Sequence, residues 1–180
     1  MVVKYVYVYK DVMFLFKSDA DVLVNTVNVK GVMGAGVAKE FKKRFPEMFK
    51  EYTRACRKGD VHIYGRFEID LRSKKDKRLI VYKIYSWKPH IWVGRFKDKK
   101  IIVLNFPTKI YWDLPSDYKI IEEGLKWLKN NINFLSKVLG REIKKIAMPQ
   151  LGCGLGGLKW GKVKHLIEKY FNEEKVIIDC

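Results

Sequence analysis

The chain has 180 residues, 48% of them hydrophobic, which is enough for one domain with a buried core and excludes an intrinsically disordered protein. Lys and Arg number 37 against 20 Asp and Glu, and the formal net charge of +17 favours a polyanionic partner, nucleic acid first, over simple solubility. The three cysteines form no CxxC pair and have no ligand-like spacing to a histidine, so we expect no metal site. Without a signal peptide or an apolar run of about 20 residues, we expect a cytoplasmic protein with no membrane partner.

Strands and helices are predicted to alternate from the amino terminus onward. Residues 2–8 and 12–16 are rich in strand-forming side chains, which predicts two strands joined by a tight turn as an opening hairpin. An apolar strand at residues 22–24 follows and leads through Asn25 and Asn28 into a loop.

This loop is rich in glycine and contains Gly31, Gly34 and Gly36. Apolar residues from Val37 onward recur at helical spacing, so a helix begins at or just after Gly36. Glycines let the backbone approach a ligand, and the amides of a helix N-terminus attract anions. The order strand, glycine loop, helix therefore predicts a phosphate site. The alternative is a turn that needs glycine only for its backbone angles.

Strand-forming residues dominate the middle of the chain, after a second helix that starts at Pro46 and ends before Gly59. Candidate strands span residues 64–71, 79–85, 91–96 and 101–105. The charged turns between them, at residues 73–77 and 97–100, are either solvated loops or, near the ligand, guides for a phosphate backbone.

The last third predicts helices around a second glycine loop. Ser116 or Asp117 can cap one long helix that ends at Gly140 and whose apolar stripe is expected to lie in the core. A strand at residues 143–149 leads into the loop LGCGLGGL at residues 151–158, and another helix and a last strand follow.

Two glycine loops fit a ligand with two phosphates better than a ligand with one. The elements predict a single α/β domain over residues 1–180 with a largely parallel sheet, and both loops would lie at its carboxyl edge, where open α/β folds bind ligands. Neither loop is a Walker A motif. Gly152, Gly154 and Gly157 do match the G-x-G-x-x-G of a dinucleotide-binding fold. That alternative stays open, but we expect it to be the weaker one because few residues remain after the motif for further strands.

Four segments in this order resemble a macrodomain, the ADP-ribose-binding α/β module. They are VNTVN at residues 24–28, GVMGAGVA at residues 31–38, NFPTK at residues 105–109 with a tryptophan soon after, and GCGLGGLKW at residues 152–160. The resemblance extends over residues 19–168. Within the family it is closest to the branch that removes ADP-ribose from thymidine bases in DNA, the DarG-type antitoxin partner of a DNA-modifying toxin. The branch that frees glutamate side chains of proteins is the nearest neighbour.

The resemblance implies a three-layer α/β/α sandwich with a mixed, largely parallel sheet of six strands or slightly more. It implies ADP-ribose as ligand and product, without a cofactor, with its diphosphate between the two glycine loops. Asn28 would touch the distal ribose, and catalysis would depend on Lys109. The expected ligand-binding residues are Asn25, Asn28, Gly31, Gly34, Ala35, Gly36, Val37, Thr108, Trp112, Gly152, Cys153, Gly154, Leu155 and Gly156.

Lysine chemistry suits this reaction, because an amine can attack or polarise the ribose carbon at which the glycosidic bond breaks. The amine must be partly deprotonated, and burial beside Phe106 and Trp112 would lower the pKa of Lys109 accordingly. Trp112 and Tyr111 can stack on a flipped base, with a core role for one of them as the alternative. Cys153 is expected to fill a tight loop and not to act as a nucleophile.

The chain departs from the family pattern in three places. Gly156 stands where the protein-directed branch has an acid/base aspartate. Most macrodomains carry a Gly-Asp pair that recognises adenine about where this chain has Met13 and Phe14, so we expect Asp19 or Asp21 to take that role. The segment from residue 64 to residue 92 is also longer than this branch usually needs.

We therefore expect a hydrolase that removes ADP-ribose from a nucleic-acid base, with thymidine in DNA as the first candidate. Its expected partners are ADP-ribosylated DNA or another nucleic acid and a cognate ADP-ribosyltransferase toxin. Two alternatives stay open. One is a reader module that binds ADP-ribose without turning it over, and the other is a hydrolase of ADP-ribosylated protein, which the net charge of +17 makes less attractive.

Overall fold

Two sheets organise the chain in the computed structural model, which describes residues 3–4, 12–71, 77–172 and 175–180. Six of the described strands form one sheet in the order β1-β8-β7-β2-β6-β5, and the other two form a separate sheet, β3-β4. The strands of the large sheet are β1 (Val3–Lys4), β2 (Val22–Val27), β5 (His90–Phe96), β6 (Lys99–Pro107), β7 (Lys145–Ala147) and β8 (Ile177–Asp179).

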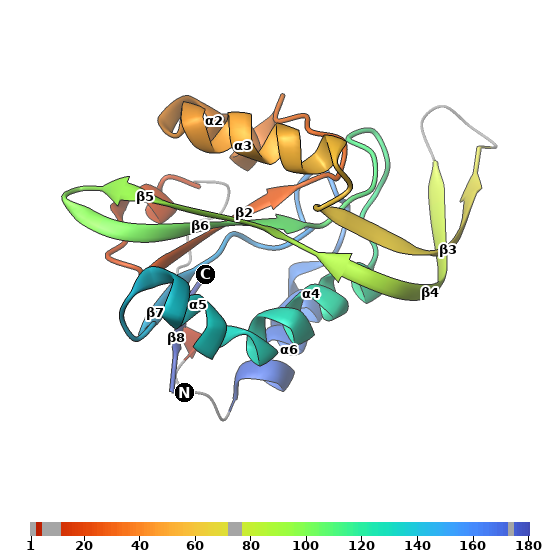
Figure 1. Ribbon diagram of the computed structural model, residues 1–180. Coiled ribbons are helices and arrows are strands. Elements are labelled where there is room, and N and C mark those ends of the chain that lie inside the picture. Colours follow the sequence, from red (N-terminus) through yellow and green to blue (C-terminus); the bar gives the residue numbers. More distant parts are fainter. Residues whose placement is uncertain (1–2, 5–11, 72–76, 173–174) are drawn as a thin grey trace.

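Neighbouring strands of the large sheet are parallel except at one edge, where β5 pairs antiparallel with β6. At the centre, β2 pairs with β6 in an unbroken register from Val22 opposite Ile102 to Val27 opposite Pro107. Because parallel strands run in the same direction, the carboxyl ends of β2, β6 and β7 meet at one edge of the sheet (Figure 1). The expected largely parallel sheet with a mixed edge is confirmed.

Helices cover both faces of this sheet and complete three layers (Figure 1). On one face lie α2 (Gly36–Arg44) and α3 (Pro46–Arg57), and on the other lie α4 (Tyr118–Asn130), α5 (Ile132–Leu139) and α6 (Trp160–Phe171). The predicted α/β/α sandwich is therefore confirmed, together with the predicted starts of α2 and α3. No helix in the described part of the chain is long and apolar enough to cross a membrane.

Side chains alternate along each central strand and fill one core on either side of the sheet. Leu23 of β2 belongs to the cluster beneath α2 and α3, whereas its neighbours Val22 and Val24 belong to the cluster beneath α4, α5 and α6. Val103 and Leu104 of β6 divide in the same way. Successive side chains of a strand point to opposite faces, so a sheet covered on both faces needs continuous apolar runs.

The separate sheet is an antiparallel arm made of β3 (His62–Asp70) and β4 (Arg78–Lys88), and it projects from the rest of the molecule (Figure 1). Its inner face packs onto α4 and the end of β6. Trp87 fixes this contact, because its indole nitrogen donates a 3.0 Å hydrogen bond to the carbonyl of Pro107 and its ring lies 4.7 Å from that of Phe106. The predicted strands in this region are confirmed, but they build an arm of their own and do not extend the large sheet.

The two charged turns differ in how much of them is described. The predicted turn at residues 97–100 is confirmed, with Lys97 and Asp98 at φ values of 52° and 61°. The predicted turn at residues 73–77 lies outside the described residues apart from Lys77.

The expected opening hairpin is wrong in its second half. Residues 14–17 form α1 (Phe14–Lys17), a single helical turn, instead of a strand. This turn buries the neighbouring side chains of Leu15 and Phe16 together in one core, where Phe16 lies 4.9 Å from Phe41 between ring centroids. A strand would point these two neighbours to opposite sides. The first half of the predicted hairpin lies outside the described residues except for β1, which pairs with β8.

The expected long helix after Asp117 is interrupted. Asp117 caps α4, since its carboxylate accepts a 2.8 Å hydrogen bond from the Lys119 amide. Asn131 then leaves the helical region, with φ −117° and ψ 12°, and separates α4 from α5. Gly140 ends α5 at φ 85°, as predicted. Most of the predicted stripe is nonetheless core, with Ile121, Leu125, Leu128, Leu135 and Leu139 buried.

Asp21 holds the amino ends of three strands together. It precedes β2, and its carboxylate accepts hydrogen bonds from Arg141 at 3.0 Å and from the backbone amides of Lys144 and Lys145 at 2.8 and 3.1 Å. Lys99, which begins β6, pairs with it at 3.1 Å. Burial, the largest single influence, raises the pKa of Asp21, but these hydrogen bonds outweigh burial and hold the pKa below its ordinary value.

Gly124→Ala is expected to destabilise the fold. A Cβ atom at this position in α4 would lie 2.0 Å from Cζ of Phe106, so the ring and the strand that carries it must shift. Overpacking of this kind costs about 1–3 kcal/mol of unfolding free energy, measurable by urea denaturation. Gly161→Ala in α6 is the matched control, because a Cβ there meets no atom within 4 Å. The higher helix propensity of alanine should raise the unfolding free energy of this variant by about 0.5–1 kcal/mol. Equal stability of the two variants would contradict the packing argument.

Asp21→Asn is expected to make stability less dependent on pH. A carboxyl whose pKa is depressed by folding stabilises the fold above its unfolded-state pKa, and this contribution disappears as the pH falls through the folded-state pKa. At pH 7 the substitution should cost about 1–3 kcal/mol in unfolding free energy. The difference from wild type should shrink as the pH falls below about 4. Asp98→Asn, in an exposed turn, is the control and should stay within about 0.5 kcal/mol of wild type.

Candidate functional site

Three loops meet at the carboxyl edge of the large sheet. The first glycine loop (residues 28–35) follows β2, the lysine loop (residues 108–117) follows β6, and the second glycine loop (residues 150–159) lies beyond β7. Backbone hydrogen bonds tie the first two loops together, from Thr108 to the Val27 carbonyl at 2.9 Å and from Val29 to the Ile110 carbonyl at 3.4 Å. Lys109 lies between these two anchor points, so its position along the edge is set by the sheet.

Asn28 organises the first glycine loop from within. Its side-chain oxygen accepts the backbone amide of Lys30 at 2.9 Å, and its side-chain nitrogen donates to the Val32 carbonyl at 2.8 Å. Tyr52 of α3 donates its hydroxyl to the Asn28 carbonyl at 2.7 Å. Asn28 is only 7% exposed, so in this structure its amide holds the loop in shape, and its contact with a ribose stays a prediction.

The end of the first glycine loop is exposed at the point where α2 begins. Gly31 has φ +81°, and a Cβ there would contact Thr53 of α3 at 3.5 Å. Gly34, Ala35 and Gly36 are exposed, and a Cβ at Gly36 would meet no atom within 4 Å. Open space therefore lies beside the start of α2, as an anion site at a helix N-terminus requires.

The second glycine loop is a tight turn closed by its own backbone. The Leu158 amide donates to the Gly152 carbonyl at 3.0 Å. Gly152 has φ +72°, and a Cβ at Gly156 would lie 2.3 Å from the Gly152 carbonyl oxygen. Only glycine fits at position 156 without moving the loop, so an aspartate has no place there. At the apex, Gly154 and Leu155 are exposed, with Leu155 at 77%.

Ser116 joins the lysine loop to the second glycine loop. Its hydroxyl donates to the Thr108 carbonyl at 2.5 Å, and its amide donates to the Gly156 carbonyl at 3.0 Å. The side chain is buried, and its Oγ atom would lie 3.1 Å from a Cβ at Gly152. The sequence predicted only a helix-capping role for Ser116, because no spacing rule connects it to either loop.

Lys109 is half-buried and carries an altered pKa. Burial is the main influence and lowers its pKa, while the carboxylate of Asp113, also in the lysine loop, acts in the opposite direction. Asp113 is itself paired with Lys77 of the arm at 2.5 Å. The expected direction of the shift is confirmed. Phe106, which was expected to contribute to it, is fully buried against Trp87, and Trp112 is 66% exposed.

Both aromatic residues of the lysine loop are exposed. Tyr111 is 42% exposed and lies beneath the Lys30 amine, which is 4.7 Å from its ring centroid. With Trp112 at 66% exposure, the alternative that one of the two belongs to the core is wrong. Two large rings at the edge that carries Lys109 are available for stacking on a base or an adenine.

A chain of buried amides runs beneath the site. The Asn25 amide donates to Oδ1 of Asn105 at 2.9 Å, and the Asn105 amide nitrogen lies 2.9 Å from Nδ1 of His90. Burial lowers the pKa of His90 to about 4, so its ring is neutral near pH 7. Asn25 is fully buried, so it supports the site from inside, and Oδ1 of Asn25 has no hydrogen-bond partner among the described residues.

The expectation that Asp19 or Asp21 recognises adenine is wrong. Both precede β2 and lie at the amino edge of the sheet, whereas the glycine loops lie at the carboxyl edge. Both carboxylates are also occupied, Asp19 by Lys145 at 2.5 Å and Asp21 by the strand-end network described above.

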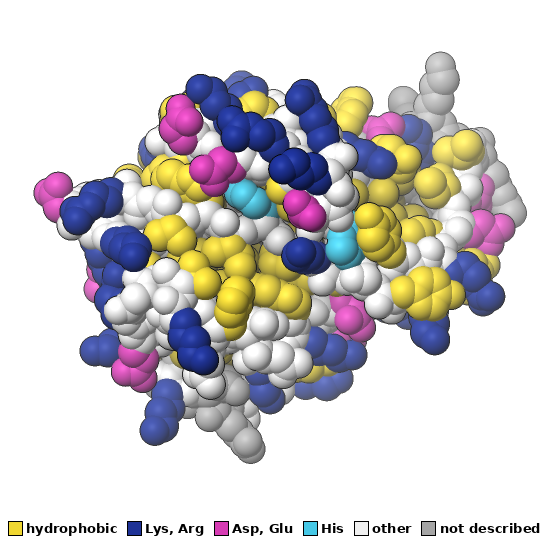
Figure 2. Space-filling view, viewed as in Figure 1, with side chains coloured by type: hydrophobic (Ala, Val, Ile, Leu, Met, Phe, Trp, Pro, Cys, Tyr) yellow, Lys and Arg dark blue, Asp and Glu magenta, His cyan; other side chains and the backbone are white. Residues whose placement is uncertain are grey.

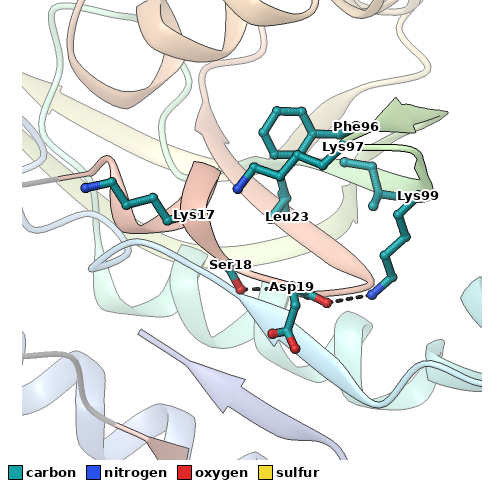
Figure 3. A pocket seen from close by; sticks show the side chains of 9 residues that line it. Lys17, Ser18, Asp19, Leu23, Phe96, Lys97 and Lys99 are labelled. Atoms are coloured by element: carbon teal, nitrogen blue, oxygen red, sulfur yellow. Dashed lines mark hydrogen bonds between the residues drawn. The ribbon is translucent and has the colours of Figure 1, made fainter.

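A small cavity of about 180 Å³ opens at the same amino edge (Figure 3). Its volume is below the roughly 300 Å³ of the smallest ordinary ligand pockets. Lys99 at its rim is engaged with the Asp19 carbonyl at 2.5 Å and with Asp21 at 3.1 Å. The cavity therefore does not compete with the carboxyl edge as the functional site. It is lined by Lys17, Ser18, Asp19, Ala20, Leu23, Phe96, Lys97, Lys99 and Ile101.

Cys153 behaves as a small loop residue. Burial raises its pKa to about 11, and its thiol donates to the Leu151 carbonyl at 3.4 Å. A thiol with a raised pKa is a poor nucleophile, in line with the expectation. Within the described ranges, no group of three or more His, Cys, Asp or Glu side chains is placed to hold a metal ion.

Comparisons with known proteins agree with this architecture. Residues 24–81 match the family model "Macro domain". The chain is 37% identical over 155 residues to the DNA ADP-ribosyl glycohydrolase of Thermus aquaticus and 35% identical over 159 residues to that of Mycobacterium tuberculosis. These matches cover 86% and 88% of this chain but only 35% and 37% of the relatives, so the chain spans little more than a third of their length.

Solved structures match over nearly the whole chain. The macrodomain of Thermus aquaticus DarG has a TM-score of 0.70 at 33% identity and covers 99% of this chain and 96% of its own. The macrodomain of Mycobacterium tuberculosis DarG has a TM-score of 0.66 at 32% identity, with 98% of both chains covered. A Thermosipho africanus DarTG structure in complex with ADP-ribose has a TM-score of 0.69 at 30% identity, over 92% of this chain and 38% of that one. The chain therefore belongs to the macrodomain family.

Proposed function

We propose that this chain is a hydrolase that removes ADP-ribose from a nucleic-acid base, with thymidine in DNA as the first substrate. The observation that carries the proposal is Lys109, a half-buried amine of lowered pKa in a loop that backbone hydrogen bonds tie to the first glycine loop and that Ser116 ties to the second. The relatives named DNA ADP-ribosyl glycohydrolase support the nucleic-acid substrate. The net charge of +17 supports it independently.

The two glycine loops are proposed to hold the diphosphate of ADP-ribose. The exposed residues Gly34, Ala35 and Gly36 precede a helix whose N-terminal amides and dipole favour an anion. The second glycine loop contributes its exposed apex at Gly154 and Leu155, where a Cβ at Gly154 would meet no atom within 4 Å. The buried members of the predicted set, among them Thr108 and Gly156, shape these surfaces from below.

Lys109 is proposed to act on the ribose carbon that carries the base, C1″. In its neutral form the amine donates its electron pair to C1″ and forms a new bond, while the bond from C1″ to the base breaks and the base leaves with the electron pair of that broken bond and takes up a proton. Water then attacks C1″ and displaces the amine, which releases ADP-ribose and restores Lys109. The lowered pKa increases the fraction of neutral amine, and the scheme needs no metal or cofactor.

Position 156 separates this proposal from hydrolysis of ADP-ribosylated protein. The protein-directed branch uses an aspartate there, and the 2.3 Å approach of a Cβ to the Gly152 carbonyl leaves no room for one. An acid/base partner for Lys109 is therefore proposed to come from the substrate or from water. The relative named DNA ADP-ribosyl transferase-DNA ADP-ribosyl glycohydrolase fusion protein, from Thermosipho africanus, supports an ADP-ribosyltransferase as the functional partner.

Lys109→Ala and Lys109→Arg are expected to lose activity on a thymidine-ADP-ribosylated oligonucleotide, measured as ADP-ribose released on chromatography. Alanine removes the amine and arginine stays protonated, so the rate of ADP-ribose release should fall about 10²–10⁴-fold in each variant. Binding of free ADP-ribose should survive in the arginine variant. Lys126→Ala, on the exposed side of α4, is the control and should keep full activity. Tight binding without release by the wild type would refute hydrolysis and support the reader module.

The reaction rate is expected to rise with pH through the pKa of Lys109. The active amine is neutral, so activity should be low where Lys109 is protonated and should reach a plateau above its lowered pKa. The Asp113 carboxylate stabilises the protonated form, so Asp113→Asn should move the pH–rate profile to lower pH. Glu123→Gln on α4 should leave the profile in place. A shift to higher pH in Asp113→Asn would contradict the role assigned to the neutral amine.

A further inference from the structure

The outer face of the β3–β4 arm is unusually rich in exposed tyrosines. We define this outer face by the side chains of His62, Tyr64, Arg66, Glu68, Tyr82, Lys83, Tyr85 and Lys88. Tyr64, Tyr82 and Tyr85 are 53%, 47% and 65% exposed. The inner face is buried against α4 and the end of β6, and none of these three rings belongs to the hydrophobic core.

Two irregularities of strand pairing give the outer face its tyrosines. The register passes from Tyr64 opposite Ser86 to Gly65 opposite Ile84, which leaves Tyr85 as an extra residue in β4. The register then passes from Arg66 opposite Lys83 to Phe67 opposite Val81, which leaves Tyr82 as a second extra residue in β4. A β-bulge re-aims the extra side chain, and both extra residues are exposed tyrosines.

Basic side chains alternate with these rings. The Arg66 guanidinium lies 5.1 Å from the Tyr82 ring centroid, and the Lys83 amine lies 5.4 Å from that of Tyr85. The Tyr82 hydroxyl donates to Glu68 at 2.5 Å, which fixes its ring beside the guanidinium. Apolar, basic and some acidic side chains are interspersed on the projecting arm in the space-filling view (Figure 2). Rings for stacking and cations for phosphates are the two components of single-strand binding surfaces.

One of the rings is already held in a stacking geometry. The Tyr64 ring stacks on His62 with 4.0 Å between centroids and 6° between planes. His62 is held in turn by the Gly59 carbonyl and the Ser86 hydroxyl, each 2.7 Å from one of its ring nitrogens. The Tyr64 ring is therefore fixed in orientation while still half-exposed, so little conformational entropy is lost when a planar group stacks on it.

The arm is connected directly to the proposed reaction site. Lys77 directly precedes β4 and pairs with Asp113 of the lysine loop. The charge of Asp113 in turn acts on Lys109. Trp87 at the other end bonds the Pro107 carbonyl, two residues before Lys109. Figure 1 shows the arm projecting from the side of the sheet toward which β2 and β6 run. A nucleic-acid strand whose ADP-ribosylated base enters the site would continue along this arm.

We propose that the outer face of the β3–β4 arm binds the unpaired nucleotides that flank the ADP-ribosylated base, with bases stacked on Tyr64 and Tyr85 and phosphates paired with Arg66 and Lys83. This inference rests on the proposed function, since it names how the same substrate is held. Unpaired nucleotides are favoured over a protein partner because the face combines rings with basic charge, in a chain of net charge +17. A second copy of this chain would bring another positively charged surface against the basic outer face, and the two would repel each other.

The test compares arm variants in binding and in turnover. Tyr64→Ala/Tyr85→Ala removes the stacking rings, and Arg66→Gln/Lys83→Gln removes the charges. Binding of an unmodified single-stranded oligonucleotide, followed by fluorescence anisotropy, should weaken about tenfold or more in the tyrosine variant. The charge variant should lower the salt dependence of binding, with a slope reduced by roughly 0.7 per lost cation. Phe134→Ala/Lys137→Gln, an exposed ring and cation on α5, is the matched control and should bind as wild type does.

Turnover separates this inference from the proposed function. Arm variants should cleave the ADP-ribosylated oligonucleotide about tenfold less efficiently, through a higher KM, and should cleave ADP-ribosylated thymidine nucleoside as wild type does. Oligonucleotide affinity unchanged in both arm variants would overturn the inference, as would wild-type dimerisation that the arm variants abolish. If wild type binds the oligonucleotide through the arm yet releases no ADP-ribose from any substrate, the proposed hydrolysis fails while the arm retains its role. Thermal unfolding of both variants confirms that each one is folded.

Discussion

The parallel pairing of β2 with β6 is the constraint on which the rest of the structure depends. Six consecutive residue pairs, from Val22 with Ile102 to Val27 with Pro107, end both strands at the same level. The first glycine loop and the lysine loop therefore start side by side, although about 80 residues separate Asn25 from Asn105 along the chain. β7 on the other side of β2 brings in the second glycine loop. One ladder of backbone hydrogen bonds, together with the pairing of β7, thus places the Lys109 amine and both glycine loops at one edge of the sheet.

Buried polar groups then give this edge its fixed shape. Tyr52 and Asn28 hold the first glycine loop, Ser116 holds the lysine loop against the second, and Asn25 with Asn105 lies beneath them. Polar groups with partners in the interior are costly to leave unpaired, so these loops have few alternative conformations. The residues predicted together as ligand-binding therefore have two different roles. The exposed ones form the surface, and the buried ones maintain it.

Charge and shape act together at the two edges of the sheet. At the amino edge, Asp21 neutralises the cations that meet there and ties three strand starts into one unit. At the carboxyl edge, Asp113 lies between Lys77 of the arm and Lys109, so the arm and the amine share a carboxylate. The arm is consequently part of the electrostatics of the site as well as a neighbour of it. Its tyrosines lie on the outer face because its inner face is occupied by the core.

The sequence by itself determined the α/β class, the strand that leads into each glycine loop, the starts of α2 and α3, and the membership of the macrodomain family, which excludes the dinucleotide-binding alternative. These follow from local periodicity and from motifs whose residues are contiguous. Only the tertiary structure decided that residues 14–17 are helical, that Asn131 divides α4 from α5, and that Asp21 lies at the wrong edge for a ligand. It also decided the roles of Ser116 and of the bulged tyrosines in the arm. Apart from the break at Asn131, whose hydrogen bonds to Leu128 and Trp127 are local, these features depend on contacts with other elements of the fold, and short-range spacing carries no information about such contacts.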